Sequence, residues 1–228
     1  VDSLVAIRKL VYEQKKLTLD EFCEIIDNDF RDHEVLRQHI IHQLPHYGND
    51  NEEVDSLAEN LANGIKKVFH GKMLGGRAMI PGSFSYVGHA SRGSKMGATF
   101  DGRKAQYSYS DGCSPVQGRD TNGPTAMVLS LSSWVQKEFL GGMVVNIKFA
   151  KEHLSGENGE RFVQILRTFM RRGGLEMQVN VVDRQTLLDA REHPELHRDL
   201  LVRIGGFSDY FVRLTPTLQQ EIIDRTEY

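Results

Sequence analysis

Several features are scarce in this chain of 228 residues, and each scarcity excludes a class of protein. Two cysteines are too few for a disulfide framework and fit a reducing compartment. No apolar run approaches the roughly 18 residues that a membrane-spanning helix needs, and no leader pattern is visible. The net charge of −3 provides no general attraction to nucleic acid or anionic membranes. We therefore expect a cytoplasmic protein with neither kind of partner.

Apolar residues recur at helical spacing through the first 70 residues. The predicted helices cover residues 2–16, 18–30, 33–44 and 51–70. The second begins with a capping-box pattern, Thr18 followed by Glu21, and Pro45 ends the third. We interpret residues 1–70 as a helical scaffold.

The character of the chain changes after residue 71. Residues 71–125 are rich in Gly, Ser, Asp and Pro and predict long ordered loops, which in compact domains are usually functional. Beyond them, strands are predicted at 143–149, 176–182 and 200–204, and helices at 159–174, 185–195 and 215–228, the last with Thr215 as N-cap and Pro216 in its first turn. Strands that alternate with helices indicate an α/β fold.

Three candidate sites are weak. His39, His42 and His46 lack a fourth ligand, so we interpret them as a polar helix face and predict no metal site. The glycine-rich stretches match neither a P-loop nor a dinucleotide fingerprint, which argues against nucleotide binding. Cys113 lies in a polar loop, but nothing adjacent would lower its pKa, and we interpret it as a spectator.

The stretch "LLVRIGGFSDYFVRL" (200–214) places two glycines directly after a predicted buried strand. A simple turn explains an isolated pair. However, "VRIGGF" (202–207), followed by a helix that ends in "RTEY" (225–228), resembles the C-terminal signature of the glycyl radical enzymes, the group that includes pyruvate formate-lyase. Further segments look like family segments in family order: "PHYGNDNEEVD", "PGSFSYVGHASRGSKMGATFDGRKA", "DGCSPVQGRDTNGPTA", "VVNIKF" and "QVNVVDRQTLLDAREHPE".

The resemblance implies a radical on the Cα of Gly206, with Arg203, Ile204, Gly205 and Phe207 as the supporting loop. Glycine is needed because a Cα radical can then flatten between an electron-donating amide nitrogen and an electron-withdrawing carbonyl. In the family a separate activating enzyme installs the radical with S-adenosylmethionine and an iron–sulfur cluster. The chain itself is expected to bind no cofactor. Cofactors elsewhere carry out the difficult chemistry, and this chain positions and protects the radical.

The resemblance also implies a fold, namely part of a ten-stranded α/β barrel with an outer helical segment. Residues 1–70 would form the outer helices and residues 71–228 the C-terminal glycyl radical domain. The implied partners are the activating enzyme, the remainder of the barrel, a small-molecule substrate and, in the complete enzyme, a second copy as a homodimer. Oxygen cleaves such radicals, so the resemblance implies anaerobic cytoplasm.

The chain departs from a complete family member in one respect. The thiyl cysteine of the family lies several hundred residues before the glycine, and Cys113 does not occupy its place. We therefore assign no thiyl cysteine here and expect the chain to be the C-terminal part of a larger enzyme.

The reaction stays open between alternatives. The segment 111–126, "NIKF" and "RTEY" look more like the eliminase, decarboxylase and fumarate-adding branches, so we favour dehydratase, decarboxylase or other lyase chemistry on C–C, C–O or C–X bonds. The first alternative is formate C-acetyltransferase activity proper. The second is a non-catalytic spare part that replaces an oxygen-cleaved terminus.

Overall fold

The computed structural model describes residues 1–83 and 88–228. Its helices are α1 (Asp2–Ile7), α2 (Leu19–Asp27), α3 (Glu34–Gln43), α4 (Glu52–Phe69), α5 (Gly88–Gly93), α6 (Gly123–Leu131), α7 (Gly156–Arg171), α8 (Arg184–Glu192) and α9 (Pro216–Asp224). The strands are β1 (Met73–Leu74), β2 (Arg77–Ala78), β3 (Val144–Phe149), β4 (Glu176–Val181), β5 (Leu201–Arg203) and β6 (Ser208–Tyr210). The family-like segment 81–105 includes residues 84–87, which lie outside the described part.

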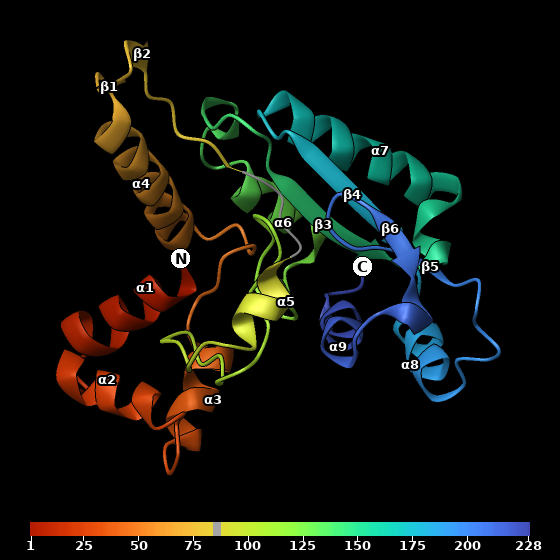
Figure 1. Cartoon of the computed structure of the whole chain (residues 1–228), viewed down its shortest axis with the longest axis horizontal. Coiled ribbons are helices and arrows are strands. Elements are labelled where there is room, and N and C mark those ends of the chain that lie inside the picture. Colours follow the sequence, from red (N-terminus) through yellow and green to blue (C-terminus); the bar gives the residue numbers. More distant parts are fainter. Residues whose placement is uncertain (84–87) are drawn as a thin grey trace.

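The N-terminal helices form where apolar periodicity predicts them. A π-helical stretch, η1 (Arg8–Glu13), continues α1, and α1 to α3 enclose a core built from Leu10, Phe22 and Ile40, among others. The predicted capping box is confirmed, because the Thr18 side chain accepts from Glu21 N–H while the Glu21 carboxylate accepts from Thr18 N–H. Helix α4 then carries the chain to the small β1–β2 hairpin at its far end (Figure 1).

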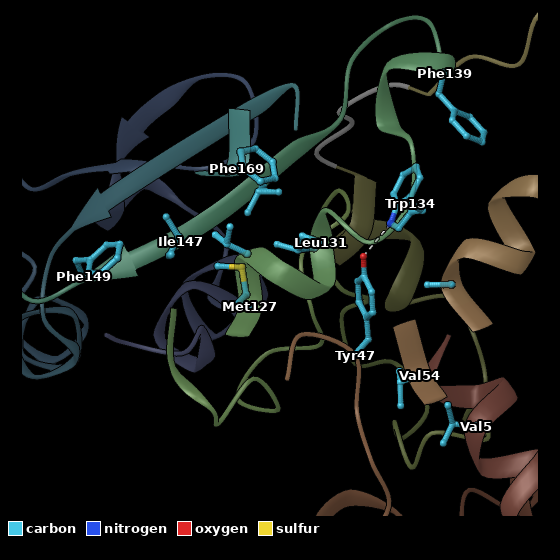
Figure 2. Close-up of a cluster of buried hydrophobic side chains, with 13 residues drawn as sticks. Val5, Tyr47, Val54, Met127, Leu131, Trp134, Phe139, Ile147, Phe149 and Phe169 are labelled. Carbon is cyan, nitrogen blue, oxygen red and sulfur yellow. Dashed lines mark hydrogen bonds between the residues drawn. The ribbon is translucent and has the colours of Figure 1, made fainter. Parts of the chain in front are cut away.

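The central unit is a β3–α7–β4 crossover. Strands β3 and β4 are parallel in the register Val144↔Glu176 to Phe149↔Val181, and α7 covers the pair (Figure 1). Every residue of β3 is buried, whereas β4 is exposed at both ends. The main core joins β3 to α6, α7 and the N-terminal half, and in it the Trp134 indole N–H donates to the Tyr47 hydroxyl at 2.9 Å (Figure 2).

A second core lies at the C-terminal end of the chain. Strands β5 and β6 form an antiparallel hairpin whose register runs from Leu201↔Tyr210 to Arg203↔Ser208. Val202 and Ile204 point into a cluster with Leu187 of α8 and with Ile222 and Ile223 of α9. Thr215 caps α9 and Pro216 occupies its first turn, as predicted. The hairpin is thus fixed on one side by apolar packing.

The mixed helix-and-strand character is confirmed, but the sheet is smaller than strand–helix alternation indicates. The described residues form three two-stranded sheets, of which only β3–β4 is parallel. Three 3₁₀ turns sit at η2 (Gln136–Glu138), η3 (Lys151–Leu154) and η4 (Phe211–Arg213). Helix α6 and strand β6 were not predicted, because α6 is apolar all round and β6 has only 3 residues. No helix among the described residues is long and apolar enough to cross a membrane.

Gly112 tests how closely the loop before β3 packs against that strand. A Cβ at Gly112 would collide with the backbone oxygen of Val144 in β3, and its φ of +57° already disfavours a side chain. Gly173 has a φ of +98° but open space around it. We expect Gly112→Ala to lower the free energy of unfolding by about 2–4 kcal/mol, and Gly173→Ala by only about 1 kcal/mol. Equal losses of unfolding free energy for the two variants, measured in urea, would contradict this close packing.

Candidate functional site

The two glycines of the sequence form the tip of the β5–β6 hairpin. The N–H of Ile204 donates to the backbone oxygen of Phe207 at 2.9 Å, which closes a turn around Gly205 and Gly206. Gly206 has a φ of +87°, where a residue with a Cβ is strained, although no atom would lie within 4 Å of that Cβ. Glycine is therefore required for backbone conformation and not for lack of space. Gly205 is buried and Gly206 is exposed in this chain.

Besides its pairing with β6, the strand that leads into the turn is held by a side chain of β4. The side-chain amide of Asn180, on β4, accepts from Arg203 N–H at 2.6 Å and donates to the Arg203 backbone oxygen at 2.9 Å. One residue pair thereby reproduces the two hydrogen bonds of a strand ladder. Gln178, two positions earlier on the same face of β4, accepts from Gly206 N–H at 3.1 Å.

Arg225, just after α9, holds the same segment from a third direction. Its guanidinium donates to the backbone oxygens of Arg203 and Ile204, each at 3.3 Å. It also forms a two-bond ion pair with Glu221, at 3.0 and 2.9 Å. Because Arg225 is buried, its charge acts where water does not screen it.

The guanidinium belongs to a buried cluster of four ionisable side chains. Asp111 lies 3.4 Å from Arg225, and His89 lies 3.3 Å from Asp111 and 3.4 Å from Glu221. These His89 contacts are ion-pair distances without aligned hydrogen bonds. Burial alone would raise the pKa of Glu221, but the charge of Arg225 and the contact with His89 lower it to about 2. At Asp111 burial prevails and raises the pKa.

All four residues of the "RTEY" ending make contacts that fix the C-terminus. Besides Arg225, Thr226 and Tyr228 both donate through their hydroxyl groups to the Asp120 carboxylate. Glu227 lies 3.7 Å from the fully buried Lys148. Burial lowers the pKa of Lys148. The ending thus ties the 111–120 loop and β3 to the segment that carries the turn.

The Arg203 and Phe207 side chains, predicted to support the loop, make few contacts with it. The Arg203 guanidinium makes a 3.4 Å hydrogen bond to the hydroxyl of Ser208, and the Phe207 ring is 45% exposed. Their supporting roles remain predictions, whereas the contacts observed at the loop come from Asn180, Gln178 and Arg225.

Sequence reasoning missed these three residues. The available signal was the polar pair Gln178 and Asn180 within a strand, together with a helix-end arginine four positions after a glutamate.

Cys113 has the surroundings of a packed thiol. Its S–H donates to the Val144 backbone oxygen at 3.4 Å, and burial raises its pKa to about 12, so a thiolate is disfavoured. His46, one of the three histidines considered above, is buried against Asp2 with its Nδ1 3.2 Å from the carboxylate. No group of three or more His, Cys, Asp or Glu suited to a metal ion occurs among residues 1–83 and 88–228.

Comparisons with known proteins identify the family of the chain. Residues 109–212, which include the turn, match the family model described as glycine radical, and residues 1–87 match the one described as pyruvate formate lyase-like. The chain therefore belongs to the glycyl radical enzymes.

Individual relatives give the same result. The chain is 38% identical to the probable dehydratase YbiW of Escherichia coli (strain K12), with 100% of the chain and 29% of that protein covered. It is 37% identical to the isethionate sulfite-lyase of Desulfovibrio desulfuricans, with 100% and 28% covered. The glycerol-bound B12-independent glycerol dehydratase of Clostridium butyricum superposes with a TM-score of 0.91 at 35% identity, over 100% of this chain and 29% of that one. The chain thus spans under a third of the relatives it matches.

The Glu221–Arg225 pair predicts an acid-dependent loss of stability. The folded state lowers the Glu221 pKa from 4.5 to about 2, so its contribution is complete above pH 4.5 and is lost as pH falls toward 2. We expect the stability advantage of the parent over Glu221→Gln to shrink by about 3 kcal/mol across that window. Urea unfolding at a series of pH values measures it, with Glu59→Gln on the exposed face of α4 as control. A constant advantage would contradict the ion pair.

Proposed function

We propose that this chain is the C-terminal, radical-bearing part of an anaerobic glycyl radical enzyme, and that it stores the unpaired electron on Gly206. The observation that carries the proposal is the turn itself. Gly206 sits at the tip of a hairpin with a φ of +87°, no neighbour where a Cβ would be, and fixed backbone on its N-terminal side.

The chemistry follows from the absence of a side chain at Gly206. When one hydrogen atom leaves Cα, the remaining electron occupies an orbital perpendicular to the plane of its three bonds. The adjacent amide nitrogen donates electron density to that orbital and the adjacent carbonyl withdraws it, so the spin spreads over both. A Cβ would crowd the flat arrangement and would strain this turn.

Installation of the radical requires an external partner. The hydrogen atom passes from Gly206 Cα to a carbon-centred radical, which an activating enzyme generates from S-adenosylmethionine with an electron from its iron–sulfur cluster. In turnover, Gly206 regains a hydrogen atom from a cysteine thiol, and the resulting thiyl removes one from a substrate C–H bond. We propose that this cysteine lies in another part of the enzyme, because the half-buried thiol of Cys113 donates to the Val144 carbonyl.

The surface around Gly206 supports the remainder of the barrel as a partner. Phe207, Leu201 and Val181 are all exposed apolar side chains on the hairpin and on β4 beside it. A stored radical must be sheltered from water and oxygen, and this surface shelters nothing by itself. We propose that the rest of the ten-stranded barrel covers it and brings the thiyl cysteine to Gly206, and that the complete enzyme forms a homodimer.

For the reaction we propose dehydratase, decarboxylase or related lyase chemistry on a small molecule. The relatives named above are a probable dehydratase, a sulfite-lyase and a glycerol dehydratase, and each is similar to this chain along the whole of this chain. These names favour bond elimination over formate-forming acyl transfer.

The test is electron paramagnetic resonance of the activated enzyme without oxygen. The parent should give a doublet, because one hydrogen remains on the Gly206 Cα and splits the signal. We expect Gly206→Ala to abolish the doublet and the neighbouring Gly205→Ala to keep it. A doublet that persists in Gly206→Ala, or no signal in the parent, would contradict the assignment.

A second experiment separates a catalytic part from a spare part. The chain is incubated anaerobically with an activating enzyme, with and without a larger fragment that contains a thiyl-type cysteine loop. We expect turnover with the intact larger portion of the same enzyme. A spin signal without turnover, followed by recovery of activity when an oxygen-cleaved partner is added, would favour the spare-part role.

A further inference from the structure

The contact between Gln178 and Gly206 links a buried strand side chain directly to the backbone of the turn. Gln178 Oε1 accepts from Gly206 N–H at 3.1 Å, although the two residues are 28 positions apart. Gln178 is 5% exposed and Gly206 is exposed, so the hydrogen bond is shielded from water on the Gln178 side. The β5–β6 ladder ends at Arg203↔Ser208 and does not reach the Gly206 amide.

The orientation of the Gln178 amide is set by a second contact. Its Nε2 donates to the Glu176 carboxylate at 2.6 Å, which leaves Oε1 facing Gly206. The reversed amide would bring an oxygen against the carboxylate and an NH₂ group against the Gly206 N–H, so both contacts would be repulsive. Glu176, Gln178 and the Gly206 amide therefore form a directed chain of hydrogen bonds along one face of β4.

The position of this hydrogen bond matters because it holds the plane of the Gly205–Gly206 peptide, on the nitrogen side of the Gly206 N–Cα bond. Asn180 and Arg225 hold the backbone of residues 203 and 204, but glycine has no side chain that would restrict its own φ. Spin on Cα spreads onto nitrogen only when the amide plane is aligned with the plane of the radical. An acceptor on the N–H also increases the electron density that the nitrogen can donate.

We propose that Gln178 is a positioning residue for the Gly206 radical: its side-chain oxygen, oriented by Glu176, aligns the Gly206 amide and strengthens donation from its nitrogen. This inference rests on the proposed function. Gln178 touches neither substrate nor the hydrogen that is removed, and it acts through the amide of Gly206.

The test uses the complete activated enzyme and compares Gln178→Leu with the parent. Loss of one partly buried hydrogen bond should lower the spin per chain about fivefold. The hyperfine coupling of the exchangeable Gly206 N–H proton, measured by double resonance in H₂O and D₂O, should also change. A purely structural role would not alter that coupling in chains that still carry the radical. Gln164→Leu, the same substitution on the exposed face of α7, should leave spin and coupling unchanged.

A charge-swapped pair keeps the inference testable if Gln178→Leu does not fold. Gln178→Glu alone sets two carboxylates side by side and should lose spin. Adding Glu176→Gln restores one donor and one carboxylate to the pair, so a free oxygen at position 178 can again accept from Gly206 N–H. We expect the double variant to recover most of the spin and the parental coupling.

The outcomes separate this inference from the function on which it rests. A parent doublet together with unchanged spin and coupling in Gln178→Leu would overturn the role of Gln178 alone. A double variant no better than Gln178→Glu would do the same. A parent without a doublet would overturn the proposed function and this inference with it.

Discussion

The arrangement of the segments around the glycine turn depends on the contacts of the buried Arg225 guanidinium. It reaches the two backbone oxygens just before the glycine turn and is itself held by Glu221 and Asp111. A buried cation without partners would be costly, so the two carboxylates and the loop carbonyls stabilise it together. The Arg225 side chain therefore joins α9, the 111–120 loop and the β5–β6 hairpin.

In this part of the fold, polar side chains form hydrogen bonds that a longer sheet would form through its backbone. The β5 strand is only three residues long, and its outer edge pairs with the amide of Asn180 instead of with a longer sheet. Such a hairpin would be marginal by itself. Val202 and Ile204 pack into the apolar cluster, and polar contacts from β4 and from Arg225 hold the backbone of residues 203 and 204. At the tip, the Gly206 N–H is held by Gln178 while no atom lies within 4 Å of the place a Cβ would take, which suits a residue whose backbone takes part in a reaction.

Much of the local structure was predictable from sequence. Apolar periodicity located the long helices, Thr18 and Thr215 marked their starts, and alternation located β3 and β4, because each of these signals acts between residues close in the chain. The family resemblance located the turn at Gly205 and Gly206. The three short sheets were not predictable, since pairing of strands a few residues long depends on what lies beside them. The holding residues were missed for a related reason: nothing local marks Gln178 or Arg225 as a partner of residues around 205.

The sequence alone therefore determined which residues form helices and strands, the need for glycine at the turn and the family to which the chain belongs. Tertiary structure decided what holds that glycine in place. Gln178 and Asn180 of β4 and Arg225 reach the loop from distant parts of the chain, and Glu221 and Asp111 hold Arg225. Asp111 and Arg225 meet across 114 positions of chain. Hydrogen bonds and ion pairs act over a few ångströms in space, and only folding brings such distant residues within that reach.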